Sequence, residues 1–108
     1  SPNCVSTWAT DAEHGIAPIP YTTSRAEAQA KMRAVVENLP LTRVIVDEPG
    51  YLYVEFRTAV MMFTDDVEFV FDDDAKQIHF RSASRLGYSD MGLNRRRMEQ
   101  IRQIFTEN

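Results

Sequence analysis

The sequence predicts an α+β fold: an antiparallel meander of about four strands, two helices packed on one face, and an irregular N-terminal arm. Three observations support this prediction. Apolar residues recur at helical spacing over residues 24–39, alternate with polar residues between 43 and 82, and return to helical spacing from residue 94. We expect one domain over residues 1–108, because a chain of this length buries a single core.

The first helix is expected to begin at Ser24, which is followed three residues later by Glu27 in the pattern of a capping box. A stripe of apolar residues then follows at helical spacing: Ala28, Met32, Val35, Val36 and Leu39. Pro40 is expected to end the helix. This amphipathic pattern indicates a structural role alone.

Four strands are expected, over residues 43–47, 51–58, 66–71 and 76–82, with short turns between them. The side chains expected to point inward are Leu52, Val54, Phe56, Val67, Phe69, Phe71, Ile78 and Phe80. The apolar run 59–63 is expected to continue the second strand or to form a bulge. Clean alternation indicates that helices cover one face of the sheet and water wets the other.

The last helix is expected over about residues 94–105, with Asn94 or Asp90 as its N-cap. Its buried stripe is expected at Met98, Ile101, Ile104 and Phe105. At the other end of the chain, prolines and a glycine interrupt residues 1–23, so this arm is expected to be irregular. Its apolar residues suggest that it packs on the domain, with Trp8 as an anchor over the core.

Composition narrows the classes of function. The chain carries 12 basic and 16 acidic residues, a net charge of −4, which argues against a general nucleic-acid binder. No apolar run approaches the roughly 20 residues of a membrane span. Cys4 is the single cysteine, so no internal disulfide forms, and we expect it to be a small buried residue. His14 and His79 each lack a second soft ligand, so we expect neither a metal nor a cofactor.

The most unusual chemistry lies where the last strand passes through a polar loop into the last helix. Three consecutive arginines near a helix start are locally unfavourable, because that end of the helix dipole is already positive. Together with acids from the preceding strand, this corner supplies the candidate binding residues. They are Asp65, Asp66, Glu68, Arg81, Ser82, Ser84, Arg85, Tyr88, Ser89, Asp90, Asn94, Arg95 and Arg96.

Two interpretations of this corner remain open. Free N–H groups at the helix start, with Arg95 and Arg96 beside them, would bind an anion, and the guanidinium fork suits a carboxylate or phosphate. Alternatively, the arginines pair with acids of the same domain and fix the crossing from strand to helix. The acids in reach are Asp65, Asp66, Asp90 and Glu99. Arg97 and Arg102 are expected to be ordinary solvated residues.

The wet face of the sheet is expected to carry a mixed lattice of charges: Glu55, Arg57, Glu68, His79 and Arg81. Opposite charges on neighbouring strands explain such a lattice structurally. The signal for catalysis is weak, because no nucleophile elbow, phosphate-binding glycine loop or dinucleotide fingerprint is present. A hydrolase acting on an anionic substrate would need His79, Glu68, Ser82 and Arg81 to converge in a pocket.

Three stretches, SPNCVS, FTDDVEF and RSASRLGYSDMGLNRRRMEQIR, closely resemble the domain-of-unknown-function family 1499, DUF1499. The resemblance covers residues 1–104, and Asp11, His14 and Pro18 sit as that family has them. It implies an exported or membrane-anchored bacterial protein with relatives in plastids of plants and algae. The segment before SPNC is commonly a leader or lipid anchor in such proteins, which fits the start at Ser1. The implied compartment is a periplasm or a thylakoid lumen.

The leading functional hypothesis is therefore a non-catalytic binding or accessory domain. It would offer the Arg/Asp-rich corner and the polar sheet face to a partner protein or a small anion. In a plastid this could be a peripheral subunit of a photosynthetic membrane complex. The alternatives are the small hydrolase described above and a purely structural ion network.

Overall fold

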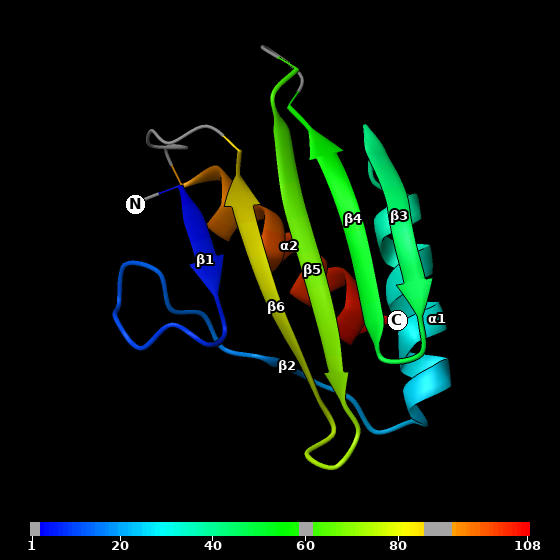
Figure 1. Ribbon diagram of the computed structural model, residues 1–108. Coiled ribbons are helices and arrows are strands. Elements are labelled where there is room, and N and C mark those ends of the chain that lie inside the picture. Colours follow the sequence, from blue (N-terminus) through cyan, green and yellow to red (C-terminus); the bar gives the residue numbers. More distant parts are fainter. Residues whose placement is uncertain (1–2, 59–61, 86–91) are drawn as a thin grey trace.

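In the computed structural model, which describes residues 3–58, 62–85 and 92–108, these residues form a six-stranded antiparallel sheet and two helices (Figure 1). Both helices lie behind the sheet in this view, so one face is covered and the other is open. The α+β class is confirmed. The strands are β1 (Cys4–Ser6), β2 (Ile19–Pro20), β3 (Thr42–Glu48), β4 (Tyr51–Arg57), β5 (Thr64–Asp72) and β6 (Gln77–Ser84), and the helices are α1 (Arg25–Glu37) and α2 (Leu93–Glu107).

The four long strands pair in chain order, as β3-β4-β5-β6, and form the predicted meander. All eight side chains expected to point inward are buried, because strict alternation places every second residue on the helix side. Ser82 continues this inward series and is fully buried. Of the run 59–63, residues 59–61 lie outside the described part, and Met62 and Phe63 are not in a strand.

The expectation of about four strands was wrong by two, since the arm contributes β1 and β2. Both pair antiparallel with β6: Val5 lies opposite Ser82, and Ile19 lies opposite Ile78. Strands of three and two residues are too short to show alternation, and Pro20 argues against a strand except at an edge. The arm therefore pairs along the outer edge of β6. Alternation of polar and apolar residues in the sequence does not predict this pairing.

Helix α1 starts as predicted, with the Ser24 side chain accepting a hydrogen bond from the Glu27 amide at 3.1 Å. Its buried Gln29 ties the helix to the β3–β4 turn. The Gln29 amide donates to the carbonyls of Glu48 and Tyr51 and accepts from the Gly50 amide at 2.9 Å. The Gln29 side chain thus supplies hydrogen-bond partners for the backbone groups of a turn that the helix covers.

Helix α2 begins one residue earlier than expected, and its N-cap is Gly92, with φ 80°. Asn94 is therefore no cap; it lies inside the helix and is fully buried. Met98, Ile101 and Phe105 are buried as predicted, and Ile104 is partly buried against the same core. Asp90, the other proposed cap, lies outside the described residues. Neither helix in the described residues is long and apolar enough to cross a membrane.

Candidate functional site

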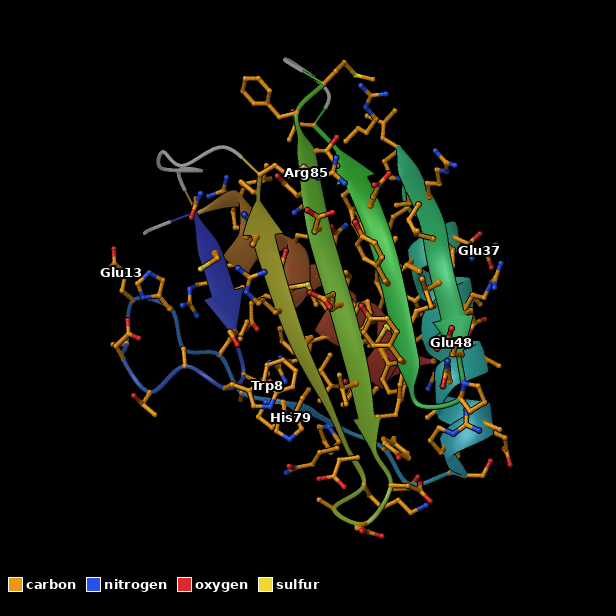
Figure 2. The ribbon with its side chains drawn as sticks, in the orientation of Figure 1. Trp8, Glu13, Glu37, Glu48, His79 and Arg85 are labelled. Carbon is orange, nitrogen blue, oxygen red and sulfur yellow. The ribbon has the colours of Figure 1, made fainter. Side chains whose placement is uncertain are left out.

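Arg85 organises the open face of the sheet near the end of β6 (Figure 2). Its Nε donates to Asp66 Oδ2 at 3.0 Å, and its Nη2 donates to Asp66 Oδ1 at 3.0 Å and to Glu55 Oε2 at 2.5 Å. Asp66 and Glu55 are opposite each other on β5 and β4. The guanidinium fork therefore bridges two adjacent carboxylates that would otherwise repel each other.

This bridge changes the acidity of its members. Hydrogen bonds from Arg85 hold the pKa of Asp66 below its ordinary value, against the opposing effect of burial. The same bonds raise the pKa of Arg85 further above its already high value. Arg85 is therefore a committed cation, with its Nε and Nη2 already bound to acids of the sheet.

Two tyrosines extend this network along β4. Tyr53 donates to Asp66 Oδ1 at 2.5 Å, and Tyr51 donates to Glu68 Oε2 at 2.7 Å. Burial, followed by the hydrogen bond to Glu68, raises the pKa of Tyr51 to about 12. The pKa of Tyr53 is also raised, chiefly by its bond to Asp66. Both phenols therefore stay protonated and act as fixed donors on the open face.

Arg81 differs from Arg85. It is exposed and lies opposite Glu68 in the register of β5 and β6. Its side chain makes no hydrogen bond or ion pair with another residue in the part of the chain that the structure describes. Of the predicted site arginines on the open face, Arg81 is thus the one whose guanidinium has no hydrogen-bond or ion-pair partner among the described residues.

Asp65, next to Asp66, faces the other way. It is 1% exposed on the helix side, where its Oδ2 lies 2.8 Å from Nη2 of Arg97. Within the described residues neither Asp65 oxygen has a partner in hydrogen-bond geometry, so this contact is an attraction of charges without an aligned hydrogen bond. Arg97 also lies over the Phe56 ring, 4.7 Å from its centroid. The expectation that Arg97 is solvated was wrong.

Asn94 lies beside this pair. Its Oδ1 accepts from Ser82 Oγ at 2.6 Å and from Arg97 Nη1 at 2.8 Å. Its Nδ2 donates to the Asn3 carbonyl at 2.9 Å and to Ser84 Oγ at 3.0 Å. Three predicted site residues, Ser82, Ser84 and Asn94, therefore join α2 to β6 and to the arm from inside the domain.

The other arginines of α2 hold the N-terminal arm. Arg95 Nη2 donates to the carbonyls of Glu13 and Gly15, at 3.1 and 2.9 Å. Arg102 donates to the carbonyls of Ala17 and Pro18, and it pairs with Glu99 at 3.1 Å. The expectation that Arg102 is solvated was also wrong. Seven residues apart, Arg95 and Arg102 lie on one side of the helix, where the arm passes.

Arg96, by contrast, is exposed, and its amide donates to the Gly92 carbonyl at 3.0 Å.

Among the described parts of the chain, the residues of the predicted corner are divided between the two faces of the sheet. Arg81, Arg85, Asp66 and Glu68 are on the open face, and Asp65, Ser82 and Asn94 are on the helix side. Tyr88, Ser89 and Asp90 lie outside the described residues.

Trp8 is not the core anchor that was expected, because it is 53% exposed on the open face. Its ring stacks on the ring of His79, with centroids 5.5 Å apart (Figure 2). The Thr7 hydroxyl contacts His79 Nδ1 at 3.0 Å and so holds the imidazole in place. Cys4 is likewise half-buried instead of fully buried. The Trp8–His79 contact could not be predicted from the sequence, because β1 itself was not predicted.

One group in the described residues has the ligand types for a metal ion: Asp11, Glu13 and His14 in the arm, with donor atoms within 4.8 Å of one another. His14 Nδ1 lies 2.5 Å from Asp11 Oδ2, and a hydrogen bond to His14 lowers the pKa of Asp11. This local ion pair explains the cluster as it stands. The expected absence of a metal or cofactor stays a prediction.

The catalytic constellation considered for a hydrolase does not assemble. His79, Glu68 and Arg81 lie on the open face, but Ser82 is fully buried on the other face and bonded to Asn94.

A hollow does lie elsewhere, at the end of β3, β4 and β5. It has a volume of about 350 Å³ and is lined by Leu41, Thr42, Arg43, Glu55, Arg57 and Thr64.

Comparison with protein-family models shows to which family this chain belongs. A family model described as protein of unknown function DUF1499 matches residues 1–105. The chain belongs to the DUF1499 family. The resemblance of the three sequence stretches is thereby confirmed, and the family match reaches both the arm and α2, which Arg95 and Arg102 join. Comparisons with curated proteins and with solved structures give no match.

Proposed function

We propose that this DUF1499 domain is a non-catalytic binding domain that uses the open face of its sheet to bind a partner protein. The observation that carries the proposal is that both helices cover one face, while the other displays a network of fixed polar groups beside exposed Trp8. Tyr51, Tyr53 and Arg85 are held in place on this face before any partner arrives. A surface ordered in advance lowers the entropy cost of binding.

The composition of the face suits protein recognition. Tyrosine, tryptophan and arginine are the residues enriched where protein interfaces bind most strongly. Trp8 provides an exposed aromatic ring, and Arg81 provides free guanidinium donors next to Glu68. Val70, 37% exposed, lies between His79 and Tyr51 in the register of the sheet and adds an apolar patch.

A small anion bound by Arg85 is less well supported, because Asp66 and Glu55 already bind its Nε and Nη2. We also propose, on the family resemblance, that the domain works in a periplasm or a thylakoid lumen. There it would serve as a peripheral subunit of a membrane complex. A targeted fusion reporter in the producing cells tests the compartment.

The binding face is tested by placing a photo-crosslinking amino acid at Arg81, on the open face, and at Gln103, exposed on α2. In the producing cells, a discrete adduct is expected from position 81 and none from 103. Trp8→Ala should abolish that adduct while leaving the melting temperature unchanged. Equal adducts from both positions, or no adduct from the open face, would refute the proposal.

A further inference from the structure

We propose that the end of the sheet formed by β3, β4 and β5 is a second surface, which contacts an anionic lipid membrane. In this arrangement Leu41 and Met62 enter the lipid, and Arg43 and Arg57 bind the headgroups. This end is at the top of Figure 1, away from the Trp8–His79 contact in Figure 2. The proposal does not rest on the protein-binding function above, although Glu55 both lines the hollow and binds Arg85 on the open face.

The first observation concerns backbone conformation. Leu41 and Met62 have positive φ angles, 61° and 54°, which bulky residues rarely adopt. A fold that only needed a turn at these positions would favour glycine or asparagine, which adopt this conformation at low cost. Both side chains are also exposed, by 45% and 44%. The chain thus keeps two large apolar groups in water at positions where they strain the backbone.

The second observation is that Arg57 joins these two residues. Its backbone amide donates to the Leu41 carbonyl at 2.9 Å, and its guanidinium contacts the Met62 carbonyl at 3.4 Å. Leu41 and Met62 are therefore brought to the same end of the sheet, although 21 positions separate them in the sequence. Two exposed apolar side chains at one end of the sheet can enter a lipid surface together.

The third observation is charge. Arg43 and Arg57 line the hollow of about 350 Å³ between β3 and β5. In the described part of the chain, the Arg43 side chain makes no hydrogen bond or ion pair, and the Arg57 guanidinium makes only its contact with Met62. Glu55 also lines the hollow, but Arg85 neutralises it at 2.5 Å. Two cations beside an apolar patch match the anionic headgroups and acyl chains of a bilayer.

The test is sedimentation of the protein with vesicles of phosphatidylcholine alone or with one third phosphatidylglycerol. Binding to the anionic vesicles is expected, with weak binding to the neutral ones and a decrease as salt is raised. The double variant Leu41→Asn, Met62→Asn should lose binding by more than tenfold, while thermal stability stays equal or rises, because asparagine tolerates positive φ. Arg43→Gln should weaken binding by about fivefold.

Two control variants match these changes. Arg81→Gln removes an exposed arginine from the open face, and Lys76→Asn replaces a third positive-φ residue, φ 54°, in the β5–β6 turn. Neither should alter vesicle binding. Equal binding to both vesicle types, no binding, or full binding by the Leu41/Met62 variant would overturn the proposal. So would NMR shifts at Arg43 and Arg57 with inorganic phosphate but not with vesicles, which would assign the hollow to a free anion.

Discussion

Asp65 and Arg97 form a buried ion pair between the sheet and α2, with 2.8 Å between Oδ2 and Nη2. The neighbouring Asp66 pairs with Arg85 on the opposite face of the sheet. Adjacent residues of one strand thus serve two different networks. The buried pair joins the two layers of the fold, and the half-exposed pair orders the surface that we propose binds a partner.

The first prediction follows from this contrast. Asp65→Ala should lower the free energy of unfolding by about 3–5 kcal/mol, because it leaves the Arg97 guanidinium buried without its countercharge. Asp66→Ala should cost much less, since water reaches Arg85, whose side chain is 49% exposed. Urea unfolding of both variants measures the difference. Equal losses would show that Asp65 does not compensate a buried charge.

Asn94 provides a second prediction. Asn94→Ala should lower the free energy of unfolding by about 1–3 kcal/mol, because Ser82, Ser84 and the Asn3 carbonyl lose a buried partner. Hydrogen exchange in β1 should accelerate more than exchange in α1. Gln100→Ala, on the exposed side of α2, is the matched control and should change neither. An unchanged β1 would mean that Asn94 does not hold the arm.

A third prediction concerns acid. In the folded domain, the hydrogen bonds of Arg85 lower the pKa of Asp66. In the unfolded chain, the pKa of an aspartate side chain is about 3.9. Asp66 therefore contributes stability above that pH, and the contribution is lost as pH falls through the lowered folded pKa. Arg85→Gln should destabilise the domain near neutral pH and do so progressively less below about pH 4.

Unfolding measured from pH 2.5 to 7 tests this dependence, and NMR titration of the carboxyl carbons assigns it to a residue. Arg85→Gln should raise the pKa of Asp66. It should leave the pKa of Asp47 lowered, because that shift comes chiefly from Arg33. A uniform shift of both carboxyls would assign the effect to overall charge instead of to the Arg85 contact.

A fourth prediction addresses the arm. Arg95→Ala removes the donor to the Glu13 and Gly15 carbonyls, so the arm should loosen around His14. The Ser6 amide, which donates to the His14 carbonyl at 2.8 Å, reports this change directly. Its hydrogen exchange should accelerate, while amides of α1 remain protected. Unchanged exchange at Ser6 would show that the arm holds its place without Arg95.

The sequence predicted those parts of the fold in which a periodic pattern carries the information. Alternation located the four long strands, and the Ser24 side chain identified the start of α1. Alternation could not locate β1 and β2, because the pairing of such short strands depends on β6, which lies far away in the chain.

The candidate site was only partly predictable for a related reason. Alternation placed Asp65 and Asp66 on opposite faces, but the sequence does not show which arginine each acid meets. Arg97 was misassigned because charged residues usually face water. Its burial depends on Asp65 from another element. Asn94 was misassigned because asparagine near a helix start is commonly a cap, whereas here Gly92 takes that position.

The contact between Asn3 and Asn94 joins residues 91 positions apart, and β1 pairs with β6, the last strand. Although the arm precedes the rest of this domain in the sequence, it is therefore among the last parts of the domain to find its place. Until β6 and α2 have been synthesised, Val5 and Ile19 have no core to enter, and the edge of the growing sheet stays open. The open edge is thus exposed to misassociation until the arm has paired with β6, which favours handling by chaperones before that pairing forms.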